Sequence, residues 1–163
     1  MTTAAEWIDR LQLERHPEGG WYAEWYRAGL KIPVKALGAR GNGVRATSTS
    51  IYYLLEPGDF SAFHRIRSDE VWHHLAGDPL AVEQISRDGS AQTTPAGIPD
   101  ASPRSKVCAG TWFGARPVGP GFALVGCTVS PGFEFDDFEM AERDRLIQVF
   151  PQHEVLITGL TRT

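Results

Sequence analysis

The stretch GDFSAFHRIRSDEVWHHLAG, residues 58–77, limits most strongly what this chain can fold into. It contains two runs, residues 60–67 and 70–75, whose side chains alternate in character and which a polar Ser-Asp break separates. A period of two is typical of strands, so we expect two adjoining strands that fold back beside each other. The same period predicts that three side chains of the second strand share one face: Glu70, Trp72 and His74. These side chains are unusual on a plain core face and indicate a functional site.

The rest of the chain shows further short extended runs with Gly and Pro at the corners. Helical patterns are confined to the ends. A capping-box sequence starts a helix at Thr3 that ends before His16, and a second helix is expected from Asp136 to Phe150. Residues 91–105, which are rich in Ala, Thr, Pro and Ser, are predicted to form a mobile loop. Short strands with helices only at the ends are typical of an all-β sandwich or barrel.

The spacing of Gly58, His64, Glu70 and Gly77 resembles the first signature of the cupin superfamily, in which a Gly, two His one residue apart, a Glu and a Gly follow in that order. Ile66 stands where the second His of that signature is expected. Longer phrases resemble the Cupin_5 branch of this superfamily, namely HPEGGWYAEWYR, IYYLLEPGDF and GTWFGARP. The resemblance implies a cupin-type double-stranded β-helix, or jelly roll, with short helices at the N- and C-terminal ends. It also implies one cupin domain over residues 1–163 and a cavity between the sheets.

The N-terminal helix and strand, residues 3–27, have two interpretations. The resemblance implies that this segment crosses to a partner subunit, and on that ground we expect a homodimer. The aromatic alternation over residues 21–27 is equally typical of an edge strand that covers its own sheet.

Composition excludes several classes of partner. The chain has 16 Lys and Arg against 20 Asp and Glu, a net charge of -4, and its basic residues are scattered. A nucleic-acid surface needs a basic stripe, so no nucleic-acid partner is expected. No run approaches the ~20 apolar residues of a membrane span, and charges occupy the N-terminal stretch where a signal peptide is apolar. We therefore expect a cytoplasmic protein that binds a small molecule.

The two cysteines, Cys108 and Cys127, lie in strand-like runs without the close spacing of a zinc knuckle. We expect buried free thiols rather than a disulfide, with a catalytic thiol at Cys127 as the alternative.

The resemblance implies a metal centre of three His and one Glu, a ligand set that suits Fe, Mn, Ni or Zn. Of those four positions the chain keeps His64 and Glu70, while Ile66 and Phe113 occupy the other two. Two ligands hold a divalent ion poorly, so we expect a site without a metal cofactor. An alternative site uses His74 as a third ligand.

Without a metal, His64 is an imidazole with an ordinary pKa of ~6.5 that can take or give a proton at physiological pH. Glu70 either orients this ring or serves as a second acid-base group. The superfamily that this chain resembles includes metal-free enzymes, the dTDP-4-dehydrorhamnose 3,5-epimerases, which use a cavity His as the base and a Tyr as the acid. Tyr52, or its neighbour Tyr53, is the expected acid here. The expected substrate-binding residues are Arg65, Trp72, His74, Phe113, Glu18 and Tyr22, and Arg45 or Arg67 is a further candidate to stabilise an enolate oxygen.

The leading hypothesis is a small-molecule enzyme that transfers protons without a metal, as in epimerisation or isomerisation. Its expected substrate is a polar or anionic carbonyl metabolite or a sugar nucleotide. One alternative is a non-catalytic cupin that binds a ligand. A second alternative is a metal-dependent cupin enzyme that uses His64, Glu70 and His74.

Overall fold

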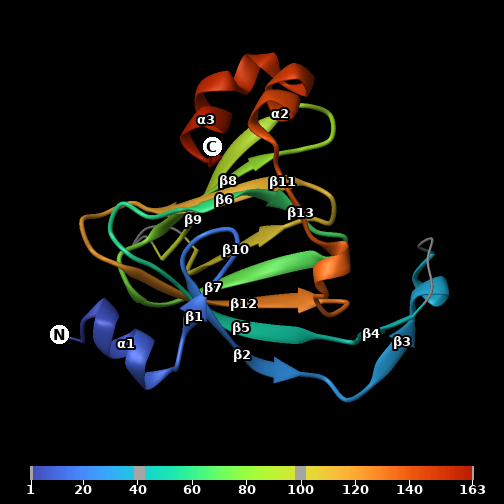
Figure 1. Ribbon diagram of the computed structural model, residues 1–163, viewed down its shortest axis with the longest axis horizontal. Coiled ribbons are helices and arrows are strands. Elements are labelled where there is room, and N and C mark those ends of the chain that lie inside the picture. Colours follow the sequence, from blue (N-terminus) through green and yellow to red (C-terminus); the bar gives the residue numbers. More distant parts are fainter. Residues whose placement is uncertain (1, 39–42, 98–101, 163) are drawn as a thin grey trace.

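Two antiparallel β-sheets face each other in the computed structural model, which describes residues 2–38, 43–97 and 102–162 (Figure 1). The six-stranded sheet contains, in spatial order, β1 (Glu14–Arg15), β2 (Trp21–Arg27), β5 (Thr49–Leu55), β12 (Ala123–Ser130), β7 (Asp69–Gly77) and β10 (Arg104–Val107). The five-stranded sheet contains β13 (Glu139–Met140), β6 (Ser61–Arg65), β11 (Trp112–Pro117), β8 (Leu80–Ile85) and β9 (Ala91–Ala96). The all-β class predicted from the sequence is confirmed.

From β5 to β8, successive strands alternate between the two sheets, as in a jelly roll. β5 and β7 belong to the six-stranded sheet, whereas β6 and β8 belong to the five-stranded sheet. The prediction that the strands of residues 58–77 lie beside each other is therefore wrong. His64 on β6 is paired with Phe113 on β11, and Trp72 on β7 is paired with Cys127 on β12. The two strands face each other across the interior instead.

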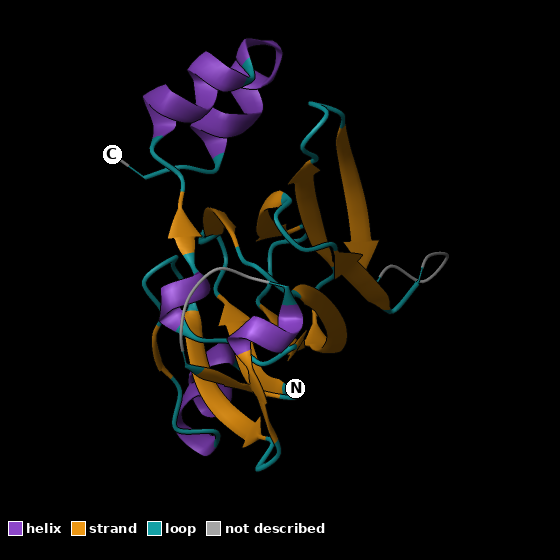
Figure 2. Cartoon of the chain, turned by 90° about the vertical axis from the view of Figure 1, so that its right-hand side faces the viewer, coloured by secondary structure: helices purple, strands orange, loops and turns teal. Residues whose placement is uncertain are grey.

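Apolar side chains pack between the two sheets and also against the outer face of each sheet. The inner cluster includes Tyr53, Trp72 and Phe113, all with side chains at most 1% exposed. On the outer face of the five-stranded sheet, a second cluster packs beneath the C-terminal helices α2 (Arg143–Val149) and α3 (Glu154–Gly159), which form one group at the top of the molecule (Figure 2). A third cluster packs helix α1 (Ala4–Arg10) onto the outer face of the six-stranded sheet.

The N-terminal helix follows its sequence signal. Thr3 caps α1 because its hydroxyl accepts the Glu6 backbone N–H at 3.3 Å, while the Glu6 carboxylate accepts the Thr3 N–H at 2.7 Å. The remaining short elements are the 3-10 turns η1 (Val34–Leu37), η2 (Phe135–Asp137) and η3 (Pro151–His153) and a hairpin of β3 (Lys31–Pro33) and β4 (Val44–Ala46) that extends away from the two sheets (Figure 1). Within the described residues, no helix is long and apolar enough to span a membrane.

Three local predictions are wrong. Cys108, one of the two thiols expected to be buried, is exposed, whereas Cys127 is buried. The loop expected at residues 91–105 contains β9 and the first two residues of β10, while residues 98–101 lie outside the described residues. The helix expected from Asp136 begins only at Arg143, because η2 and β13 come first and β13 pairs with β6. That pairing places Met140 opposite His64 and carries the η2 turn across the cavity mouth.

Candidate active site

A cavity of about 190 Å³ lies between the two sheets. Five buried side chains with ionisable groups line it: Glu18, Tyr53, His64, Glu70 and Cys127. A second set, mostly aromatic or charged and less buried, surrounds the mouth: Glu14, His16, Tyr22, Glu24, Arg27, Phe133, Glu134, Phe135 and Phe138. Thr49, Ile51, Ile66 and Val129 complete the lining. A concave site with an apolar lining and a few convergent polar groups is where ligands usually bind.

The HPEGG turn, residues 16–20, carries Glu18 into this cavity. The turn is closed by the His16 N–H, which donates to the Gly20 carbonyl at 3.1 Å, and is tied to β6 by the Ala62 N–H, which donates to the Glu18 carbonyl at 2.8 Å. Gly19 has a φ of 109°, and a Cβ there would collide with the Phe60 carbonyl and the Arg162 guanidinium. Only glycine allows this close approach, so the turn sequence itself places Glu18 beside His64.

The hydrogen bonds of His64 define which ring nitrogen carries the proton. Nδ1 lies 2.7 Å from the Ala62 carbonyl oxygen, which can only accept, so Nδ1 is the donor. In the neutral ring Nε2 is then an acceptor, and it lies 3.3 Å from Oε2 of Glu18. Burial lowers the pKa of His64 to about 4, although the hydrogen bond to Ala62 opposes this shift. At neutral pH the ring is therefore uncharged and its lone pair faces a carboxyl group.

Glu18 is the centre of a three-residue cluster with His16 and His64. Its Oε1 accepts the Ser61 hydroxyl at 2.9 Å, and its Oε2 lies 3.4 Å from Nδ1 of His16. That Nδ1 accepts the Glu18 backbone N–H at 3.3 Å, so it carries no proton in the neutral ring. Burial raises the pKa of Glu18, an effect that His16 and the Ser61 hydroxyl partly oppose. Two lone pairs that face one carboxyl oxygen require a proton, which Glu18 therefore shares with His64.

His16 is also neutral in this arrangement. Burial lowers its pKa, while the carboxyl of Glu18 raises it and His64 lowers it further. Its ring packs edge-on against Tyr22 with centroids 4.6 Å apart.

Glu70 projects into the same cavity from the six-stranded sheet and is 7% exposed. Burial, together with the nearby carboxyl of Glu18, raises its pKa to about 8. The Cys127 thiol lines the same cavity and partly opposes this shift, and its own pKa is raised above its usual value by burial and then by the charge of Glu70. At pH 7 Glu70 is mostly a neutral acid. The partner expected for it, His64, is instead bonded to Glu18.

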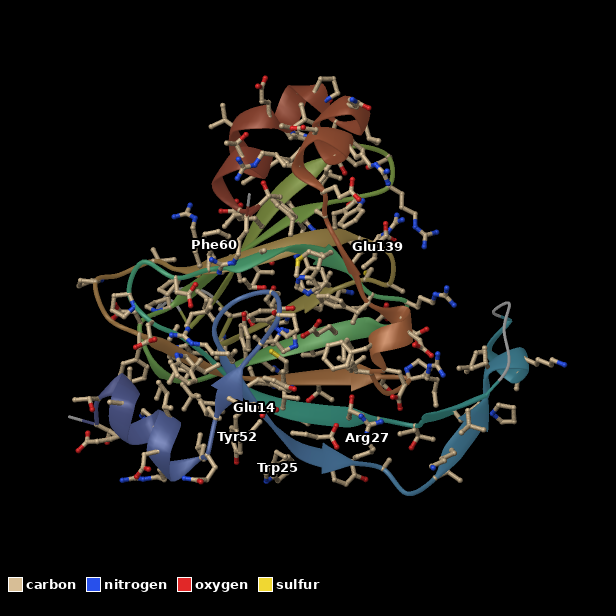
Figure 3. All side chains as sticks on the ribbon, viewed as in Figure 1. Glu14, Trp25, Arg27, Tyr52, Phe60 and Glu139 are labelled. Atoms are coloured by element: carbon tan, nitrogen blue, oxygen red, sulfur yellow. The ribbon has the colours of Figure 1, made fainter. Side chains whose placement is uncertain are left out.

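The tyrosine expected to act as an acid, Tyr52, lies outside the cavity. On β5, Ile51 and Tyr53 point between the sheets, so Tyr52 points to the opposite face, where it packs in the cluster beneath α1. Tyr52 and Trp25 lie together on that outer side, with ring centroids 6.3 Å apart (Figure 3). The neighbouring Tyr53 is the buried one, and its hydroxyl donates to the Gly19 carbonyl at 2.7 Å. The prediction that Tyr52 lines the cavity is therefore wrong, whereas its neighbour Tyr53 does line it.

Two of the predicted substrate-binding aromatics belong to the core. Trp72 and Phe113 are at most 1% exposed and lie outside the cavity lining. The Phe113 ring packs against the His64 ring, with centroids 4.1 Å apart. The Trp72 indole N–H has no hydrogen-bond partner among the described residues. Both predictions are corrected, because volume and burial place these rings in the packed interior.

Four predicted polar residues also lie away from the cavity. Arg65 forms an ion pair with Glu139 at 2.7 Å on the outer side of β6. His74 lies further along β7 than Glu70, and its Nε2 lies 3.1 Å from the Asp78 carbonyl oxygen. Arg45 and Arg67 both face Asp137, at 2.6 and 3.7 Å. Alternation placed His74 on the face of Glu70, whereas Arg65 was a candidate that no such rule placed. Only Glu18, Tyr22, His64 and Glu70 of the predicted set line the cavity.

The side chains present do not fit the metal centre that a cupin fold implies. Ile66 and Phe113 are apolar at two of the four ligand positions, and His64 directs both ring nitrogens to protein partners. Within the described parts of the chain, no group of three His, Cys, Asp or Glu side chains is arranged to hold a metal ion. His74 does not join His64 and Glu70, so the metal-dependent alternative that needs all three is not supported by this geometry.

Sequence reasoning missed His16 and the three phenylalanines at the cavity mouth: Phe133, Phe135 and Phe138. The HPEGG phrase held a usable signal, because a His and a Glu two residues apart in a turn stabilised by glycine can both point to one side. The phenylalanines follow the last long strand without a regular period and gave no such signal.

Comparison with known proteins supports the fold. A model of the Cupin_5 family, described as cupin superfamily (DUF985), matches residues 5–141. A crystal structure of a Shewanella oneidensis protein is 38% identical, covers 99% of both chains and has a TM-score of 0.88. A hypothetical protein from Leishmania major is 33% identical, covers 99% of this chain and 100% of its own, and has a TM-score of 0.89.

More distant structures share the fold alone. Oxalate decarboxylase from Bacillus subtilis is 16% identical, with a TM-score of 0.56 over 90% of this chain and 36% of its own. A search of curated proteins gave no match.

Proposed function

The chain belongs to the Cupin_5 family of the cupin superfamily, and from the acid-base groups in its cavity we propose that it is a small-molecule enzyme that transfers protons without a metal. The proposed reaction is an epimerisation or isomerisation next to a carbonyl group. One observation carries the proposal: the Glu18–His64 pair and the neutral acid Glu70 line one cavity from opposite sheets. Proton transfer at carbon needs a base on one side and an acid at the carbonyl oxygen.

The roles follow from the geometry of the three groups. The pair becomes a base when its shared proton leaves: with Glu18 ionised and His64 neutral, it takes a proton from the substrate carbon, and that proton is again shared between the two side chains. Glu70 donates its proton to the carbonyl oxygen as the enol forms. In epimerisation, water delivers a proton to the other face of the same carbon, Glu70 takes its proton back from the enol oxygen, and the pair releases its proton to solvent. In isomerisation of a hydroxy carbonyl compound, the shared proton returns to the adjacent carbon and the hydroxyl on the first carbon gives up its proton. Raised carboxyl pKa values suit both roles near neutral pH.

The cavity volume limits the size of the substrate. At about 190 Å³ it is smaller than the roughly 300–1,000 Å³ of pockets that enclose drug-sized ligands. A small carbonyl metabolite is therefore favoured over a whole sugar nucleotide, whose nucleotide would extend beyond the mouth.

Solvent exchange tests the proposal across many candidate substrates at once. A library of small ketones and aldehydes is incubated with the protein in D₂O, and NMR detects deuterium that replaces hydrogen next to the carbonyl. We expect exchange with at least one compound, and a loss of about 10²–10⁴-fold in Glu18→Gln and His64→Ala. Tyr52→Phe is the matched control because Tyr52 lies outside the cavity. Exchange that survives in both cavity variants, with folding verified by circular dichroism, would refute the proposal.

A second candidate, a non-catalytic cupin that binds a ligand, is favoured by one feature. Glu18 and His64 satisfy each other and their neighbours through hydrogen bonds, as a purely structural network also would. Ligand binding without deuterium exchange would select this candidate.

The assembly and location are also part of the proposal. We propose a homodimer that works in the cytoplasm, with the N-terminal segment at the interface. The exposed Trp25 and Leu30, at 66% and 72%, support a partner surface along β2 and the β3–β4 hairpin.

A further inference from the structure

Three phenylalanine rings at the mouth of the cavity stand nearly at right angles to one another. The planes of Phe133, Phe135 and Phe138 meet at angles of 79°, 74° and 75°, and their centroids lie 5.1 to 6.1 Å apart. His16 and Tyr22 line the same space at 87° to each other. The faces of aromatic rings are negative, so rings arranged as adjoining walls attract organic cations.

The charged groups at this mouth also favour a cationic ligand. Glu14, Glu24 and Glu134 line it together with Arg27, so three carboxylates face one guanidinium. Arg27 is already engaged, because it contacts Glu24 at 2.7 Å and Glu134 at 2.6 Å. Glu14 takes part in no ion pair within the described residues. An anionic ligand would find no available cation among the lining residues described, and it would meet an excess of negative charge.

Glu18 and Glu70 add no negative charge in their protonated forms, so the two ends of the cavity differ. The inner end presents neutral acid-base groups, and the mouth presents carboxylates and aromatic faces. A ligand that matches both ends has an uncharged polar group inside and a cationic group outside.

We infer that the ligand of this cavity carries an organic cation, such as an alkylated ammonium group, that lies among the phenylalanine rings. Its carbonyl end would reach Glu18 and Glu70, and this part of the inference rests on the proposed function. The inferred ligand differs from the anionic metabolite expected from the sequence, because the arginines considered there face Asp137 and Glu139 instead of the cavity.

Three probes of nearly equal shape test the inference: choline, its neutral isostere with a tert-butyl group in place of the trimethylammonium, and the anion tert-butylacetate. Isothermal titration calorimetry measures the affinity of the full-length protein for each probe. Choline is expected to bind about ten-fold more tightly than the neutral isostere, and the anion most weakly. Equal affinities, a preference for the anion, or no choline binding at millimolar concentration would each overturn the inference.

Variants identify the groups responsible. Phe135→Leu and Glu14→Gln are each expected to weaken choline binding about five-fold and to leave the isostere within two-fold. Glu154→Gln removes one exposed carboxylate on α3, outside the cavity lining, and serves as the charge control. If Glu154→Gln weakens choline binding as much as Glu14→Gln does, the effect is general and the inference fails.

These outcomes are separable from those of the proposed enzyme. Choline has no carbonyl, so its binding does not depend on proton transfer. Choline binding without deuterium exchange would contradict catalysis alone, and exchange without a preference for cations would contradict only the ligand class.

Discussion

Replacement of Glu70 by Gln should change how the stability of the protein depends on pH. Burial raises the pKa of Glu70 from 4.5 to about 8, so the folded state holds a proton that the unfolded chain releases. The free energy of unfolding therefore falls as pH rises from 4.5 toward 8, by about 1.4 kcal/mol per pH unit. Above the folded pKa the loss is complete, because both states are then ionised. Gln cannot titrate and removes this dependence.

Between pH 6.5 and 8, the change in the free energy of unfolding comes from Glu70 and not from His64. The pKa of His64 is lowered from 6.5 to about 4, so its contribution has the opposite sign and is lost as pH falls below 6.5. Across the 1.5 units from 6.5 to 8, the wild type should lose about 2 kcal/mol relative to Glu70→Gln. Urea unfolding at four pH values in this window measures the difference, with the exposed Glu154→Gln as the control. Parallel curves for wild type and Glu70→Gln would show that Glu70 is ionised at neutral pH, and its role as an acid would be lost.

Three further predictions concern the turn, the tyrosines and the assembly. Gly19→Ala should lower the free energy of unfolding by at least about 1–3 kcal/mol in urea unfolding, because φ is 109° and the new Cβ meets the Phe60 carbonyl. Gly29→Ala is the control, since its Cβ enters open space and the free energy of unfolding should stay within about 0.5 kcal/mol. Equal effects of the two substitutions would contradict the strained turn. Tyr53→Phe should lower thermal stability because its buried hydroxyl bonds to the turn, while Tyr52→Phe should not; the reverse order would contradict the assigned faces of β5. Analytical ultracentrifugation should show a homodimer, shifted toward monomer in Trp25→Ser; a monomeric wild type would contradict the proposed assembly.

Local signals in the sequence predicted the elements that depend on nearby residues. The capping box at Thr3 starts α1, and the alternation over residues 21–27 marks β2, because both patterns are complete within a few residues. The prediction of a loop at residues 91–105 was wrong for a physical reason. β9 lies at a sheet edge and is largely exposed, and Thr94 is held by hydrogen bonds to Gln84 and Ser105 instead of by an apolar stripe.

The candidate site was only partly predictable for a related reason. His64 and Glu70 were identified from a spacing within one stretch, and both line the cavity. The hydrogen bond by which Glu70 would orient His64 is not present, because the chain crosses between the sheets from β6 to β7 and a distant turn places Glu18 beside His64. The identity of a residue's neighbours across the sandwich depends on topology, which periodicity does not contain.

The proposed chemistry depends on one proton that His64 and Glu18 share in a buried cavity. An NMR titration of the imidazole nitrogens of His64 tests this most directly, since nitrogen shifts distinguish the two neutral tautomers and the charged ring. We predict a neutral ring at pH 7 with its proton on Nδ1, no charging of the ring until the pH approaches 4, and a changed Nε2 shift in Glu18→Gln. A ring that titrates near 6.5, or an Nε2 shift that is unaffected by Glu18→Gln, would contradict the shared proton.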